Sequence, residues 1–370
     1  MSMRKGIGMT SLRNAGATGV LASVILLLVA MATPLRAEGP VTIRIGFASV
    51  GIDNRQFAGG SSAAVAHANK SLEEEFKDNA DVKVQWFFFK GAGPAVNEAF
   101  ANGQLDFAIQ GDLPQVIGRA SGLKTKILMA SGAHAPTYLA VAPDSDIKTI
   151  KDLKGRKVSI FRGTNNHLAV VKVLAANGLS ERDLQVINMD EASTNAALAS
   201  KNIDAAFGNF GLLLLADQGL AKIVYTTKGD NPAFERHSTL IATDAFVTQH
   251  PDLTGRVVKV FVTAALWSSQ EENREALFAI WAKSGRPVES YRRDFADQPL
   301  KYRNSPLLDD FLLAQYRVQA QQAREYGLVR RDVSVDGWFA PQFLDAALKE
   351  LRLETYWTRH GADGKAVKGS

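Results

Sequence analysis

The sequence predicts an α/β fold of two lobes, each a mostly parallel sheet flanked by helices. Short β-branched runs alternate with apolar runs at helical spacing, which is the pattern of parallel strands joined by crossover helices. One arrangement of helix, turn and strand recurs at a constant offset of 98 residues, so that residues 97–108 align with 195–206. The 370 residues suffice for two domains with separate cores.

The elements follow in order along the chain. Strands are expected at 41–47, 82–89, 105–109 and from 158. Helices are expected after the loop 48–62 as far as about Phe76, after Pro94 as far as Phe100, at 168–176 and in the second repeat near 195. Two short apolar runs, 138–142 and 239–242, are expected to cross between the lobes. The first lobe should therefore comprise 38–138 and 240–359, and the second 139–239. Helices at 251–267, 271–284, 307–326 and 341–351 should cover the first lobe, and residues 360–370 are expected to be disordered.

The first 37 residues have the composition of a secretory signal peptide. Basic residues precede an uncharged run from Ala15 to Ala32, and Ala37 offers a cleavage point. A membrane anchor is the competing interpretation, but the run is rich in small residues. Export to a periplasm-like compartment is expected, and the absence of cysteine excludes both disulfides and a lipid-modified cysteine.

The charge of the chain argues against a nucleic-acid partner. The formal net charge is +5, and the first 37 residues hold four basic and no acidic side chains, which leaves +1 for the remainder. A nucleic-acid surface would need a clustered basic stripe.

The strongest candidate for a ligand site is a turn between a strand and a helix. Gly163 makes the turn, Thr164 and Asn165 are candidate N-caps, and Gly178 ends the helix. The first N–H groups of a helix lack partners and, with the helix dipole, favour a small anion. Arg162 adds a positive charge. Most such turns bind nothing, so the functional interpretation depends on the second copy of the arrangement.

That second copy lies in the first repeat. The offset of 98 pairs Gln110, Gly111 and Asp112 with Gly208, Asn209 and Phe210. Asp112 could be a catalytic acid, but an aspartate followed by Leu-Pro fits a helix N-cap better, and a capping aspartate can still line a cleft.

Signatures of catalysis and of cofactor binding are absent from the sequence. The six histidines have no pair at the spacing that places two ligands on one helix face, so no metal is expected. Nucleophile-elbow, Walker and zincin motifs do not occur, and the Gly91-Ala-Gly93 turn lacks the third glycine of a dinucleotide site. No cofactor is expected.

Several segments resemble one known family. The chain resembles the substrate-binding proteins of ABC importers for aliphatic sulfonates, nitrate and taurine over residues 41–250, and more loosely to Trp338. The resemblance is carried by Ile45-Gly-Phe47, Gly91-Ala-Gly-Pro94, Gly103 to Pro114, Ile150 to Val158, Arg162-Gly-Thr-Asn-Asn-His167 and Lys201 to Ala205. The Gly-Asp-Leu-Pro and Gly-Thr-Asn-Asn-His turns are most similar to those of aliphatic sulfonate members.

The resemblance implies a two-lobed periplasmic binding protein fold of type II, with two hinge crossings and a ligand between the lobes. By the resemblance the ligand would lie near Gly111, Asp112, Gly163, Thr164 and Asn165. The full set of candidate ligand-binding residues adds Ser49, Arg55, Gly93, Arg162, Asn209 and Phe210. Two departures concern selectivity. Asn209-Phe210-Gly211 replaces a turn that begins with tryptophan in the family, and the loop at 48–60 is longer, with Arg55 as an added charge.

The expected function is that of a non-enzymatic receptor. It would capture a small anionic solute, best an aliphatic sulfonate, close around it and dock as a monomer on an inner-membrane ABC permease. Nitrate, taurine or another solute are alternatives. An enzyme such as a thiamine-pyrimidine synthase is a second class, but those enzymes depend on a cysteine-rich motif, and menaquinone-pathway enzymes lack an export signal. A periplasmic sensor partner remains a third interpretation.

Overall fold

The computed structural model describes residues 39–367, so the predicted signal peptide at 1–37 and the run at 15–32 lie outside the described residues. Residues from Thr42 onward form one compact unit, to which the following description refers. No helix among residues 39–367 has the length and apolar character that a membrane crossing requires.

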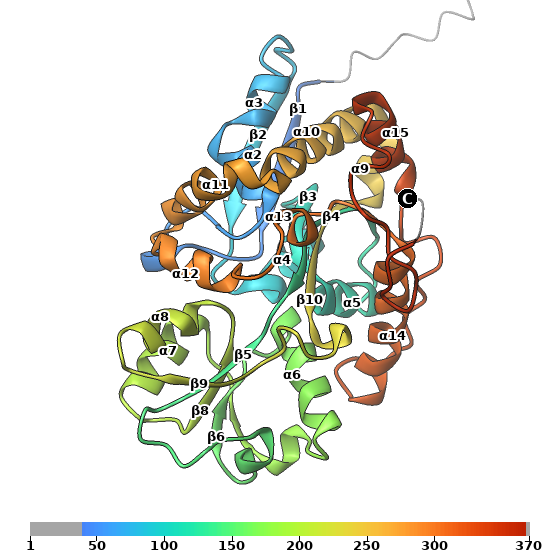
Figure 1. The fold of residues 1–370 in the computed structure, drawn as a ribbon. Helices are drawn as coiled ribbons and strands as arrows, with labels where there is room; N and C mark the ends of the chain where they lie inside the picture. Colours follow the sequence, from blue (N-terminus) through green and yellow to red (C-terminus); the bar gives the residue numbers. More distant parts are fainter. Residues whose placement is uncertain (1–38, 368–370) are drawn as a thin grey trace, which may run out of the picture. The chain divides into compact units, whose positions relative to one another are not determined.

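The first lobe is built on a five-stranded sheet in the order β2-β1-β3-β10-β4 (Figure 1). Its strands are β1 (Val41–Phe47), β2 (Val82–Phe88), β3 (Phe107–Gly111), β4 (Thr125–Ala135) and β10 (Arg236–Thr243). β1 and β3 are parallel, with Ile45 opposite Phe107, whereas β10 is antiparallel to both β3 and β4. β10 therefore runs opposite to β1, β3 and β4.

Helices surround this sheet. They are α2 (Ser62–Ala68), α3 (Ser71–Glu75), α4 (Ala92–Ala101), α5 (Asp112–Ala120), α9 (Asp244–Gln249), α10 (Pro251–Ser269), α11 (Arg274–Trp281), α12 (Val288–Asp294), α13 (Leu300–Arg303), α14 (Asp310–Glu325) and α15 (Pro341–Leu351), with 3₁₀ turns at Ile52–Asn54, Glu271–Asn273 and Ala282–Ser284. The helices of the last third of the chain pack in this lobe. Trp338 and Tyr316 pack edge to face in its core, and neither side chain is exposed.

The second lobe repeats the design with the order β7-β6-β8-β5-β9. Its strands are β5 (Tyr138–Val141), β6 (Lys157–Ser159), β7 (Gln185–Ile187), β8 (Ala205–Gly208) and β9 (Lys222–Thr226); its helices are α6 (Asn165–Ala176), α7 (Glu191–Ala199) and α8 (Gly211–Asp217), with 3₁₀ turns at Ile150–Leu153, Glu181–Asp183 and Pro232–Phe234. β6 is parallel to β7 and β8, and β5 is antiparallel to β8 and β9.

The 98-residue repeat corresponds to matching structure. Adding 98 to the bounds of α4, β3 and α5 gives 190–199, 205–209 and 210–218, which are the positions of α7, β8 and α8 within one or two residues. The repeat thus covers two turns, each joining the end of a strand to the start of a helix. The predicted fold class is confirmed, and β10 and β5 are the strands that run antiparallel to their neighbours in the two sheets.

The end of the chain differs from the expected disordered tail. The backbone N–H of His360 donates to Asp309 Oδ2 over 3.0 Å, and His360 pairs with Ala366 in an isolated β-bridge. Residues 360–367 therefore pack against the start of α14, because Asp309 supplies both the cap of that helix and an acceptor for the tail.

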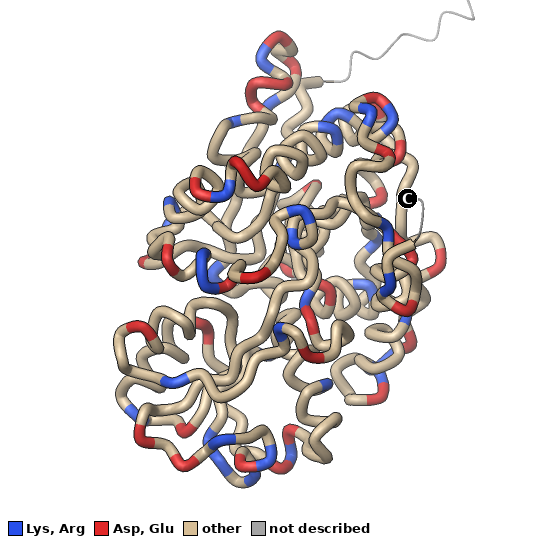
Figure 2. Tube along the Cα trace, viewed as in Figure 1, with Lys and Arg blue, Asp and Glu red and all other residues tan. Residues whose placement is uncertain are grey.

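Figure 2 shows acidic and basic residues interspersed along the described chain.

Candidate ligand-binding site

A cleft of about 220 Å³ lies where the carboxyl ends of strands from both sheets meet. The helices α2, α4, α6 and α8 begin at or next to residues that line it, namely Ser61, Gly93, Asn165 and Phe210. The positive dipole ends of several helices therefore border one space. This arrangement can bind an anion.

Seven of the eleven predicted site residues line this cleft. They are Ser49, Gly93, Gly111, Thr164, Asn165, Asn209 and Phe210. The remaining four, Arg55, Asp112, Arg162 and Gly163, are not among the lining residues, and each has a local structural role.

Two of these four are the arginines that were expected to balance the charge of an anion. Arg162 has a half-exposed side chain that pairs with Glu181, with 3.1 Å between Nε and Oε1. Arg55 is exposed on the long loop and lies against Gly285. Neither arginine lines the cleft, although both lie next to turns that border it. Arg162 instead pairs with Glu181, which belongs to a 3₁₀ turn later in the chain.

The other two are held by hydrogen bonds near the starts of their helices. The N–H of Gly163 donates to His167 Nδ1 over 3.1 Å, so that donor is occupied. Asp112 is buried; its Oδ1 accepts from Leu113 N at 2.7 Å and its Oδ2 from Gln319 at 3.0 Å. Burial raises the pKa of Asp112, although its hydrogen bonds and nearby Lys172 oppose this. The prediction that Asp112 caps the helix is wrong: Gly111 is the N-cap of α5, and Asp112 is the first helical residue, whose carboxylate links α5 to Gln319.

The positive charge of the cleft comes from Arg236, which the sequence analysis missed. Arg236 begins β10 and lines the cleft. Its Nη2 donates to the carbonyl of Pro136 over 2.5 Å, and its buried Nε has no partner among the described residues. A guanidinium has five N–H donors, so most of its donor capacity remains available. Burial lowers the pKa of Arg236, which nevertheless stays charged at neutral pH.

The second arginine of the cleft is neutralised by the protein. Arg303 Nη2 lies 2.9 Å from Asp294 Oδ2, and both side chains are at most 5% exposed. The Tyr138 hydroxyl donates to the other oxygen of Asp294 over 2.8 Å. Asp294 therefore already has partners for both oxygens, which leaves Arg236 as the charge without a carboxylate partner in the cleft.

Phe210 forms an apolar wall and joins the lobes. Its ring lies 5.0 Å from that of Tyr291 and 5.0 Å beneath the guanidinium of Arg286. Arg286 also pairs with Glu191 at 2.5 Å, and Glu191 accepts from Asn209. Asn209 thus supports the contact between the lobes, and its amide is engaged by the protein.

The lobes meet closely at the cleft. A Cβ built on Gly111 would lie 2.6 Å from Asn165 Cβ, so glycine is required for this approach of β3 to α6. The ion pair between Lys90 and Asp190, at 3.4 Å, and that between Arg293 and Asp217 also cross from one lobe to the other. The structure is that of a cleft closed by contacts on both sides.

Comparison with known proteins identifies the family. Residues 76–272 match the family described as NMT1/THI5 like. The chain belongs to the NMT1/THI5-like family. Among solved structures, this family member is similar to a protein from Methylobacillus flagellatus KT that is provisionally named a periplasmic sulfonate-binding protein, SsuA. The two share 32% identity with a TM-score of 0.76, over 88% of this chain and 98% of the other.

Curated relatives of this NMT1/THI5-like chain carry related names. One from Bacillus subtilis, provisionally named an aliphatic sulfonates-binding protein, is 27% identical over 76% of this chain and 83% of its own. One from Escherichia coli with the same provisional name is 30% identical over 45% of this chain, and the alignment spans only 49% of that relative. The predicted resemblance is confirmed. At 18% identity, the desulfurization enzyme DSZB shares the fold with a TM-score of 0.61.

Proposed function

We propose that this chain is the solute-binding receptor of an ABC importer that captures a short aliphatic sulfonate between its lobes. The observation that carries the proposal is Arg236, a cation with unused donors in a closed cleft where helix N-termini converge. The names of the relatives support the same ligand class. Hinge opening would admit the ligand, and the closed form would dock on a membrane permease.

The walls of the cleft favour an alkyl sulfonate over nitrate and taurine. Phe47, Ile109, Pro114 and Phe210 offer apolar surface that an alkyl chain would cover and that nitrate would leave bare. The ammonium group of taurine would need an acidic partner, and Asp294 is already bound by Arg303 and Tyr138. A plain alkanesulfonate satisfies both conditions.

The same lining favours binding over catalysis. It contains neither histidine nor cysteine within the described residues, so a hydroxyl there would have no neighbouring imidazole to activate it. In keeping with this, the relatives compared above that share at least a quarter of their residues with this chain are named as binding proteins. We also propose that the protein is located in the periplasm after cleavage of its signal peptide. Sequencing the N-terminus of the exported protein tests this.

Calorimetry on residues 38–370, unfolded and refolded to remove bound solute, tests the ligand class. Ethanesulfonate and butanesulfonate should bind more tightly than taurine, nitrate, bicarbonate or benzenesulfonate. Tighter binding of taurine would contradict the reasoning about Asp294, and no binding of any sulfonate would refute the proposed ligand. Saturable turnover of a sulfonate or sulfinate would show that the protein is an enzyme and would refute the proposal that it is only a receptor.

A further inference from the structure

A second cavity, of about 290 Å³, lies on the other side of β4 and β10 from the cleft. Successive residues of a strand point to opposite faces, so Arg236 faces the cleft while its neighbour His237 faces the cavity. His134 lines the cavity from β4, where its φ of 54° is unusual for a residue with a side chain. The β10–β4 pairing is irregular at the same level, between Arg236 and Ser238.

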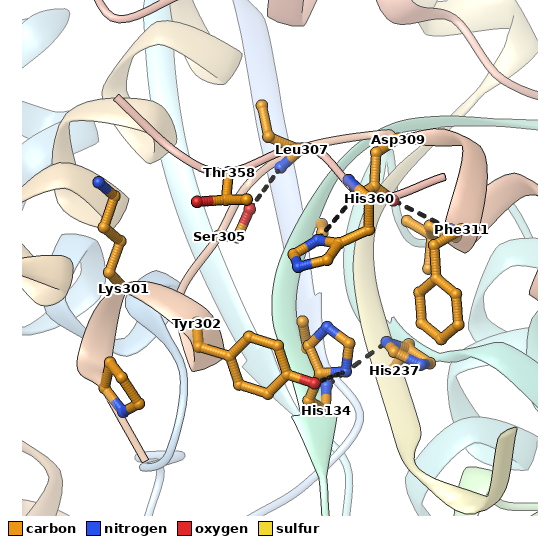
Figure 3. Close-up of a pocket in the computed structure, with 14 residues that line it drawn as sticks. His134, His237, Lys301, Tyr302, Ser305, Leu307, Asp309, Phe311, Thr358 and His360 are labelled. Atoms are coloured by element: carbon orange, nitrogen blue, oxygen red, sulfur yellow. Dashed lines mark hydrogen bonds and ion pairs between the residues drawn. The ribbon is translucent and has the colours of Figure 1, made fainter. Parts of the chain in front are cut away.

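The inner wall of the cavity is aromatic. Figure 3 shows Tyr302, His134, His237 and Phe311 gathered around the cavity. The His134 ring is within 15° of parallel to the rings of Tyr302 and Phe311, at centroid distances of 3.9 and 5.5 Å. Leu307 adds aliphatic surface. Such walls suit a flat apolar molecule, and a cavity of about 150 Å³ already holds benzene.

His237 presents an unused hydrogen-bond donor to this cavity. It is 2% exposed, and its Nδ1 accepts from the backbone N–H of His134 over 3.5 Å. Burial lowers the pKa of His237 well below its usual value, so the ring is neutral. Because Nδ1 accepts a hydrogen bond, the single ring proton is assigned to Nε2. Nε2 has no partner among the described residues. A buried donor without a partner is costly, which suggests that a bound molecule supplies the acceptor.

We propose that this cavity binds a small phenol-like aromatic molecule whose oxygen accepts a hydrogen bond from His237 Nε2. Tyr302, Phe311 and Leu307 border the space for the ring, and Lys301 and Thr358 also line the cavity. A metal ion is not the occupant, because the described residues include no group of three suitable ligands placed to hold one. The site is separate from the sulfonate cleft and does not depend on the function proposed for it.

Titration of phenol into the protein labelled with ¹⁵N-histidine tests the site. The Nε2 resonance of His237, assigned by its loss in His237→Phe, should shift and saturate with a dissociation constant on the order of 1 mM, as expected for so small a ligand. Toluene has the same shape without the oxygen and should bind about 3- to 10-fold more weakly, and His237→Phe should weaken phenol by the same factor. Equal binding of phenol and toluene would overturn the hydrogen bond.

Two further measurements locate the ligand. Thr358 is an exposed residue of the cavity lining, so Thr358→Trp should fill the cavity and block phenol without disturbing the core, whereas Thr358→Ser should leave phenol binding unchanged. Saturating ethanesulfonate should not displace phenol. Displacement would place phenol in the cleft, and a His237 resonance unmoved by phenol would show that the cavity holds solvent only; either result overturns the proposal.

Discussion

Arg236→Met tests whether Arg236, which lines the cleft, supplies the positive charge that the sequence analysis assigned to Arg162 or Arg55. A charge-assisted hydrogen bond contributes about 1.5–3 kcal/mol, so its loss should weaken ethanesulfonate binding about 10- to 160-fold. The free energy of unfolding without ligand should stay level or rise, because the guanidinium is partly buried with no carboxylate partner and Arg303 nearby. Calorimetry gives the first quantity and urea unfolding the second.

Arg162→Met is the matched control for this experiment. Its guanidinium is half-exposed and paired with Glu181 outside the cleft lining, so the change should alter affinity by less than about twofold. Arg236→Lys should fall between Arg236→Met and the native protein, because an ammonium keeps the charge without the planar fork. Native affinity in Arg236→Met, or an equal loss in Arg162→Met, would refute the assignment of the anion site.

Three further predictions concern closure, the buried network and pH. Gly111→Ala should weaken ligand binding about 5- to 150-fold by calorimetry, because the added methyl group would meet Asn165 at 2.6 Å; unchanged affinity would show that closure does not need this contact. Tyr138→Phe removes a buried hydrogen bond to Asp294 and should lower the free energy of unfolding by about 1.5–3 kcal/mol in urea, and a loss below about 0.5 kcal/mol would contradict that value. Burial raises the pKa of Glu235 to about 8, so the folded state holds this proton more tightly than the unfolded state, and stability should fall between about pH 4.5 and 8. Glu235→Gln should flatten that slope in urea unfolding, and an unchanged slope would count against the shift.

Local sequence patterns predicted most of the fold because the relevant interactions are short in range. Thr164 is the N-cap residue of α6 and Gly178 follows its end with a φ of 74°, both as their residue types indicate. The strand β4 was not predicted, since its Ala, Ser and Gly residues have little strand propensity. Its pairing with β10, more than a hundred residues later, is a tertiary contact that no local window contains.

Some cleft residues could be predicted from local sequence, and others depend on tertiary contacts. Gly111 and Asn165 belong to turns whose residue types mark a strand end and a helix start, so the sequence located them. Arg236 begins a strand that otherwise resembles a core strand, and its place in the cleft depends on the irregular pairing beside it and on the assembly of two lobes. Arg162 was expected there because it adjoins a helix start, but Glu181, distant in sequence, pairs with it.

The ion pairs between the lobes should make closure of the cleft depend on the ionic strength. Lys90, Asp217 and Arg293 are each more than a third exposed, so dissolved salt screens their attraction. A shell of counterions would lower the fraction of closed protein without touching the ligand. The receptor proposed above should therefore close less completely and bind its solute less tightly as the ionic strength rises.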